Sequence, residues 1–213
     1  MKKLSVFIFS LALAQASCFA QFSIAGSAGL NMSNNAAINA PCAFYQNSFQ
    51  GKFTPFYFAE IRPTYSFGKR WRASLGVQYS VKGNYSKSNK YSTALSYIDI
   101  LPTAEYKINK YLSVFGGFNV GFLNAENYIK DGKWGNFVIP IYNKTDFGGL
   151  LGVRAYYKNI CLSAHFNHSI ATTLNGDFTD ENGIVFTKVK LYNQNFQLGV
   201  GYIFDFSKEM KKI

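Results

Sequence analysis

The alternation of apolar and polar positions that organises this chain runs through residues 95–122. Two arms meet at Asn109-Lys110, and apolar residues hold every second position in each arm. Successive side chains of a β-strand point to opposite faces, so each arm has one apolar and one polar or small face. The parity of the arms predicts a tight hairpin whose loop holds an odd number of residues. Each arm has about ten residues, the length of a tilted transmembrane strand, and a hairpin of a soluble sandwich is the alternative.

The same alternation recurs in six further segments. They span residues 22–33, 57–66, 71–82, 146–157, 160–167 and 195–204. Long polar connections at 34–52, 83–92, 124–144 and 169–190 alternate with short turns at 67–70, 109–110 and 158–159. Such a regular order of long and short connections is typical of outer-membrane barrels. The pattern therefore predicts an all-β fold: an eight-stranded antiparallel up-and-down transmembrane β-barrel with long extracellular loops and short periplasmic turns.

The first twenty residues have the composition of an export signal. A basic start at Lys2-Lys3 precedes an apolar run at 4–14, and Cys18 and Ala20 supply small residues before Gln21. This is the order of a cleaved secretory signal, and the run is too short for a transmembrane helix. A lipoprotein signal using Cys18 is the alternative. We therefore expect a signal peptide at 1–20, an outer-membrane barrel at 21–206 and a short periplasmic tail at 207–213.

The net charge of the chain limits which kinds of partner we expect. Without Lys2 and Lys3 the exported chain has 20 basic and 11 acidic residues, a net charge of +9. The basic residues are scattered, and nucleic-acid binding conflicts with export, so we expect contact with outer-membrane lipid and lipopolysaccharide head groups. An aromatic content of 18% suits the aromatic girdles that a barrel needs at two membrane interfaces.

Four segments carry a family resemblance. They read SYIDILPTAEYKI, SVFGGFNVGF, DFGGLLGVRAYYKN and FQLGVGYIF. They resemble the PorT-like family of small bacterial outer-membrane barrels, over roughly residues 97–204. The chain departs from the family pattern at Leu101, which separates Asp99-Ile100 from Pro102, and in the polar tail after Phe204. The resemblance implies a place in a Gram-negative cell envelope and, as in some members, a role beside the proteins of a secretion or gliding machine.

Seven polar side chains fall on the face opposite the apolar stripe. They are Glu60, Arg62, Arg72, Asp99, Glu105, Arg154 and His165. The interior of an eight-stranded barrel is just wide enough for side chains to fill, and buried charges persist only when they are paired. We therefore expect these residues to form a structural network of ion pairs and hydrogen bonds that seals the lumen. A ligand or ion path is the alternative.

The sequence offers little for catalysis or metal binding. His165 and His168 are three positions apart in a strand, so they face opposite ways and cannot jointly chelate a metal. The segment is similar to the lipid A deacylase, an eight-stranded barrel with a His and a Ser two apart, but Asn167 and Ile170 follow the two histidines here. Ser163 shares the lumen face with His165, away from a lipid substrate. We expect no catalytic residue, no cofactor and no metal, and keep a lipid A-modifying enzyme as an alternative.

Two cysteines remain after residue 20. Cys42 falls in the first long connection and Cys161 just after the last short turn, near opposite membrane faces. A disulfide needs Cα atoms within about 7 Å, so we expect both thiols to be free. Neither has an evident basic partner in the sequence, so neither is expected to be a nucleophile.

Three function classes follow. The first is a non-enzymatic structural or surface-interaction barrel whose outer loops contact sugars, host surfaces or partner proteins. The second is an accessory component of a secretion or gliding machine. The third is a small passive channel, which the narrow lumen disfavours. The sequence identifies neither a ligand nor an oligomeric state.

Overall fold

Eight long alternating segments of the chain form one closed antiparallel sheet. The computed structural model describes residues 21–38, 53–86, 90–137, 142–179 and 185–206. The strands in chain order are β1 (Phe22–Ile38), β2 (Thr54–Phe67), β3 (Trp71–Ser86), β4 (Tyr91–Lys107), β5 (Leu112–Lys130), β6 (Lys133–Asn136), β7 (Thr145–Tyr157), β8 (Ile160–Ser169), β9 (Leu174–Thr179) and β10 (Val185–Asp205). Within these described ranges, no helix is long and apolar enough to cross a membrane.

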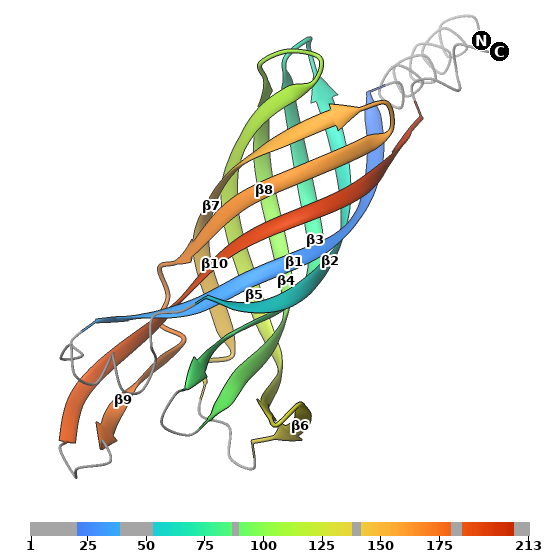
Figure 1. Ribbon diagram of the computed structural model, residues 1–213. Coiled ribbons are helices and arrows are strands. Elements are labelled where there is room, and N and C mark those ends of the chain that lie inside the picture. Colours follow the sequence, from blue (N-terminus) through green and yellow to red (C-terminus); the bar gives the residue numbers. More distant parts are fainter. Residues whose placement is uncertain (1–20, 39–52, 87–89, 138–141, 180–184, 207–213) are drawn as a thin grey trace, which may run out of the picture.

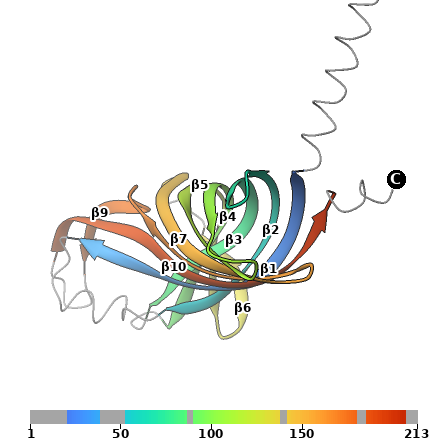
Figure 2. The same ribbon diagram turned by 90° about the horizontal axis from the view of Figure 1, so that it is seen from above.

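The ring consists of β1, β2, β3, β4, β5, β7, β8 and β10, each hydrogen-bonded to the next. It is closed by β1 and β10, which pair from Ser23↔Asp205 to Ile38↔Lys190. Figures 1 and 2 show the tilted strands winding around this ring. The predicted eight-stranded antiparallel up-and-down barrel is therefore confirmed. The two remaining strands, β6 and β9, pair only with extensions of β5 and β10.

The short turns lie where the alternation places them. Tyr157 pairs with Ile160 across Lys158-Asn159, and Lys158 adopts a left-handed φ of 54°. The β4–β5 hairpin pairs Lys107 with Ser113, which leaves an odd number of residues between them, as predicted. Its loop is held by the side-chain oxygen of Asn109, which accepts the N–H of Tyr111 at 2.7 Å.

The predicted boundaries of the long connections are wrong. β5 continues to Lys130 and turns into β6, whereas the sequence pattern ended the strand near residue 123. β10 begins at Val185 rather than near 195, and β9 lies inside the predicted fourth connection. The ladder of backbone hydrogen bonds does not need the apolar alternation, so it continues after that pattern stops, and in β9 and β10 it carries a small buried cluster of Leu174, Val189 and Leu191. Residues 39–52, 87–89, 138–141 and 180–184 of the four connections, Cys42 among them, lie outside the described residues, as do 1–20 and 207–213.

The outer face of the ring is apolar. Many of its large hydrophobic side chains are exposed, among them Ile61, Leu151 and Val200. Along β3, Val77 on the outer face is 49% exposed while its neighbour Gln78 on the inner face is 1% exposed. A continuous exposed apolar belt around a polar interior is the reverse of a soluble sandwich and requires a lipid environment.

An aromatic band surrounds the barrel at the turn end. Trp71 packs edge-on against Tyr106 at 5.0 Å, and Tyr202 packs on Phe204 at 4.9 Å. Arg70 donates to the hydroxyl of Tyr106 at 2.7 Å. Aromatic rings with basic neighbours are the usual contents of a membrane interface, where the ring is in lipid and the polar tip reaches water.

Candidate functional site

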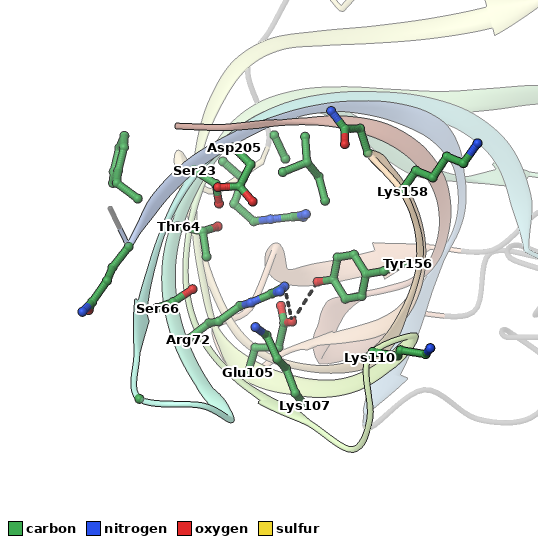
Figure 3. A pocket seen from close by; sticks show the side chains of 17 residues that line it. Ser23, Thr64, Ser66, Arg72, Glu105, Lys107, Lys110, Tyr156, Lys158 and Asp205 are labelled. Atoms are coloured by element: carbon green, nitrogen blue, oxygen red, sulfur yellow. Dashed lines mark hydrogen bonds and ion pairs between the residues drawn. The ribbon is translucent and has the colours of Figure 1, made fainter. Parts of the chain in front are cut away.

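The lumen at the turn end holds a network centred on Glu105. Its carboxylate accepts hydrogen bonds from Arg72 Nη1 at 3.0 Å, Arg154 Nη1 at 2.7 Å and the Tyr156 hydroxyl at 2.8 Å. Arg72 and Glu105 are direct cross-strand neighbours on β3 and β4, and Figure 3 shows Arg72 and Tyr156 converging on the carboxylate. Arg154 also stacks over the Phe115 ring, with Cζ 3.5 Å from its centroid. The charge of Glu105 is therefore fully engaged by side chains of neighbouring strands.

A second part of this network lies on β2. Glu60 and Arg62 are two apart and share the inner face, and Arg62 Nη1 donates to Glu60 Oε2 at 3.0 Å. Ser27 donates to the same oxygen at 2.9 Å. Arg62 Nη2 lies 3.9 Å from the sulfur of Cys161, a buried free thiol. The expectation that Cys161 has no basic partner is thus wrong, because strand pairing around a closed ring brought β2 and β8 together across the lumen.

The half of the lumen away from the short turns, which we call the outer half, holds a separate network centred on Lys82. This ammonium group is completely buried and pairs with Asp99 at 2.8 Å and Asp146 at 3.1 Å. Asn193 donates to Asp146 at 3.1 Å, and the Tyr97 ring lies under the ammonium group at 4.6 Å. Lys82 and Asp146 were not among the seven residues predicted for the lumen. Lys82 is an even number of positions from Gln78 on β3, and Asp146 is an even number from Arg154 on β7. This parity places both residues on the inner face and could have predicted them.

The middle of the lumen is partly apolar. Leu101, Phe115 and Leu150 form a buried cluster on the inner faces of β4, β5 and β7. The ring of Phe115 packs edge-on against His165, with ring centroids 5.7 Å apart. Gly152 lies so close to both side chains that any larger residue there would clash with them. Sequence reasoning predicted an interior of polar groups alone and missed this cluster, because an inward Leu or Phe looks like an irregularity in the alternation.

The seven predicted residues therefore divide between three levels of the lumen. Arg72, Glu105, Arg154, Glu60 and Arg62 are at the turn end, His165 is in the middle, and Asp99 is in the outer network. All of them except the partly exposed Arg72 are buried. The turn-end network has a net charge of one positive unit, and the outer network has a net charge of one negative unit. The two net charges cancel one another in the lumen as a whole.

The two histidines do not form a metal site. His165 is buried in the lumen, whereas His168 is exposed on the outer face and stacks on Phe166. In the part of the chain that the structure describes, no three His, Cys, Asp or Glu side chains are placed to hold a metal ion. Ser163 and His165 share the inner face, as predicted.

A closed eight-stranded ring with a lipid-facing belt and a filled polar interior defines the class of small outer-membrane β-barrels. Within that class, the chain belongs to the family described as outer membrane protein beta-barrel domain, whose model matches residues 14–175. Among curated proteins, no sequence matches the chain significantly.

Solved structures of outer-membrane proteins are similar to the chain at low sequence identity. Neisserial surface protein A is 16% identical, with 85% of this chain and 96% of that chain covered and a TM-score of 0.50. Ail, the attachment invasion locus protein of Yersinia pestis, is 16% identical, with coverages of 86% and 99% and a TM-score of 0.48. A major outer membrane protein from Thermus thermophilus is 14% identical, with coverages of 86% and 98% and a TM-score of 0.45. At this level of identity the likeness to Neisserial surface protein A concerns the fold alone.

Proposed function

We propose that this protein is a non-enzymatic outer-membrane barrel whose lumen is sealed and whose outer end presents a surface for interaction. The observation that carries the proposal is the filled middle of the lumen. A void beside Arg62, Arg154 and His165 measures only about 10 Å³, about the space of one water molecule. Ion pairs above and below it leave the charged groups neutralised by one another rather than available to a passing solute.

The outer half of the lumen is narrowed further by direct bonds between β1 and β3. Asn31 donates to the carbonyl of Val81 at 2.6 Å, and the hydroxyl of Ser33 accepts the N–H of Gly83 at 2.9 Å. These bonds join strands that are not neighbours in the ring, so they cross the interior. A polar core held in this way supports a structural role for the lumen and disfavours the passive channel.

The interaction surface would be formed by strands that continue past the ring. β1 pairs with β2 only as far as Ser33, and among the described strands its last residues pair in the sheet with β10 alone. Figure 1 shows this sheet, completed by β9, and the β5–β6 hairpin projecting from the end opposite the short turns. Exposed residues of both signs lie on these projections, among them Lys130, Asp177 and Lys188.

The orientation in the envelope is part of the proposal. Gln21 and Asp205, near the two ends of the described chain, line the same cavity as the turn residues Gly68 and Lys158. In bacterial outer-membrane barrels short turns face the periplasm. We therefore assign the turn end to the periplasm, residues 1–20 to a cleaved signal peptide, 21–206 to the barrel and 207–213 to a short tail. Lipid and lipopolysaccharide would contact the outer belt.

The non-enzymatic assignment rests on where the reactive groups lie. Ser163 and His165 face the lumen, and the ring of His165 lies against Phe115. A lipid substrate approaches a barrel from outside, so neither side chain could reach an acyl ester. This arrangement argues against a lipid A-modifying enzyme.

Two measurements test the proposal. The purified protein in planar bilayers should show no steady conductance, and long-lived uniform openings would overturn the sealed lumen. Affinity purification of the tagged protein from native outer membranes should yield the barrel without a stoichiometric secretion complex. Recovery of such a complex would instead support the accessory role that the PorT-like resemblance suggests.

A further inference from the structure

The turn end of the lumen contains a cavity that the sealed interior does not explain. It measures about 580 Å³, within the range of small-ligand sites. Its floor is the Arg72–Glu105–Tyr156 network, and its rim includes Gly68, Lys110 and other residues of the short turns, so it opens at that end of the barrel. Figure 3 shows Arg72, Glu105, Lys107 and Tyr156 directed into this space.

Basic residues outnumber acidic ones in the lining of the cavity. Five of its lining residues are basic and two are acidic. The basic residues are Arg62, Arg72, Lys107, Lys110 and Lys158, and the acidic ones are Glu105 and Asp205. Glu105 already accepts hydrogen bonds from Arg72, Arg154 and Tyr156, so its charge is used within the network. A concave basic surface of this kind concentrates anions, since the protein walls reduce screening by water.

The basic groups differ in where they point. The ammonium groups of Lys110 and Lys158 lie over the rings of Tyr111 and Tyr157, at 4.8 and 5.6 Å, and Figure 3 shows both side chains directed away from the cavity. Lys107 is half-buried inside it, and while its backbone N–H donates to the carbonyl of Arg70, its ammonium group forms no hydrogen bond or ion pair with any of the described residues. The ammonium group of Lys107 inside the cavity therefore has free hydrogen-bond donors. Lys110 and Lys158 at the rim lie instead over aromatic rings of the membrane interface.

Two arginines add further donors. Arg72 donates a hydrogen bond to Glu105 through Nη1. Its side chain lines the cavity and is 21% exposed. Arg62 pairs with Glu60 through Nη1, while among the described residues its Nη2 contacts only the sulfur of Cys161, a weak acceptor at 3.9 Å. Guanidinium and ammonium groups placed together are the usual ligands of phosphate and carboxylate oxygens.

We propose that this turn-end cavity binds a small, multiply charged anion bearing phosphate or carboxylate groups, held chiefly by Arg72 and Lys107. Hydroxyl groups of Ser23, Thr64 and Ser66 on the walls provide further donors for the body of the ligand. The assignment adds a ligand site to a barrel whose proposed role is otherwise structural. It depends only on the contents of the cavity and holds whichever way the barrel is oriented.

Calorimetric titration of the folded protein in a non-ionic detergent tests the site, with sodium pyrophosphate and sodium citrate as probes and sucrose as a neutral control. We expect saturable binding of at least one anion at about 0.15 M salt, where diffuse surface attraction is largely screened. Preference for pyrophosphate would identify a phosphate ligand, and preference for citrate a carboxylate ligand. Absence of binding by both anions overturns the proposal.

Two lysine variants with the same change in net charge locate the site. Lys107→Gln should weaken anion binding about tenfold, the loss of one charged hydrogen bond, whereas Lys158→Gln should change it less than about twofold. Equal weakening by both variants would indicate attraction to overall charge and would overturn the site. Arg72→Lys, which keeps the charge beside Glu105 but removes the planar fork, provides the same test if Lys107→Gln does not fold. Unchanged affinity in Arg72→Lys would then overturn the proposal.

Discussion

Gln78 on β3 and Gln197 on β10 donate hydrogen bonds to each other's side-chain oxygen across the lumen, at 3.0 and 3.2 Å. Both residues are about 1% exposed. The pair satisfies one donor and one acceptor of each amide without charge. It lies between the positive turn-end network and the negative outer network, so it closes the lumen between them.

The first prediction concerns this pair. Gln78→Leu should lower the free energy of unfolding by about 1–3 kcal/mol, because the amide of Gln197 stays buried without its partner. Gln197→Leu should cost a similar amount. The double variant should cost less than the sum, since no buried amide is left unpaired. Urea unfolding in lipid vesicles, followed by tryptophan fluorescence, measures all three.

Gln194→Leu is the matched control for the single and double variants of Gln78 and Gln197. Gln194 is only partly buried, and its amide bonds to the exposed His168, so its replacement should change stability by less than about 0.5 kcal/mol. Strict additivity of the Gln78 and Gln197 changes would show that the two amides do not interact.

The second prediction concerns Lys82. Lys82→Met should lower the free energy of unfolding by about 3–5 kcal/mol, because it leaves Asp99 and Asp146 buried without their cation. Adding Asp146→Asn and Asp99→Asn should restore part of this loss by removing the uncompensated charges. Lys188→Met, at an exposed position of β10, is the control and should be nearly neutral. A nearly neutral Lys82→Met would show that the aspartates are not held by this lysine.

The third prediction concerns topology. Trypsin added to intact cells should cleave the β5–β6 hairpin, where Lys130 and Lys133 flank an exposed turn. It should spare Lys69-Arg70 and Lys158, which lie in the short turns at the other end. Mass spectrometry of the released peptides identifies the sites. Cleavage at Lys158 but not at Lys130 would reverse the proposed orientation.

The fold was predictable because each strand repeats one physical constraint. An outer face in lipid and an inner face in a narrow polar lumen impose a period of two, and a closed ring repeats it in every strand. The strand ends were not predictable in the same way. At Lys130 and Val185 the strands have left the region of apolar alternation, and backbone pairing continues there with the help of small apolar clusters such as Leu174, Val189 and Leu191.

The inner face was readable from the alternation, but the partners within it were not. Parity places Arg72, Glu105 and Arg154 on one side of the sheet, yet says nothing of which carboxylate each arginine meets. The contact between Arg62 and Cys161, 99 residues apart, depends on the closure of the ring and the tilt of its strands. The Leu101–Phe115–Leu150 cluster depends likewise on three strands that bring apolar side chains to one level.

The final prediction distinguishes a lipid-facing residue from its neighbour in the lumen. Val77 is exposed on the apolar belt, whereas Gln78 is buried against Gln197. If Val77 lies near the bilayer midplane, Val77→Arg should cost about 2–4 kcal/mol. A soluble sandwich would also penalise this change, because it would bury a charge in an apolar core. Stability alone therefore does not separate the two environments.

Accessibility to a lipid-soluble probe does separate them. In a variant with Cys42 and Cys161 replaced by serine, single cysteines at 77 and at 78 can each carry a fluorescent label in reconstituted vesicles. A quencher restricted to the bilayer should reduce the emission from position 77 and leave that from 78 unchanged, because the wall of the barrel separates the lumen from lipid. Equal quenching at the two positions would contradict the assignment of the outer face to lipid, and with it the role given to the paired groups inside.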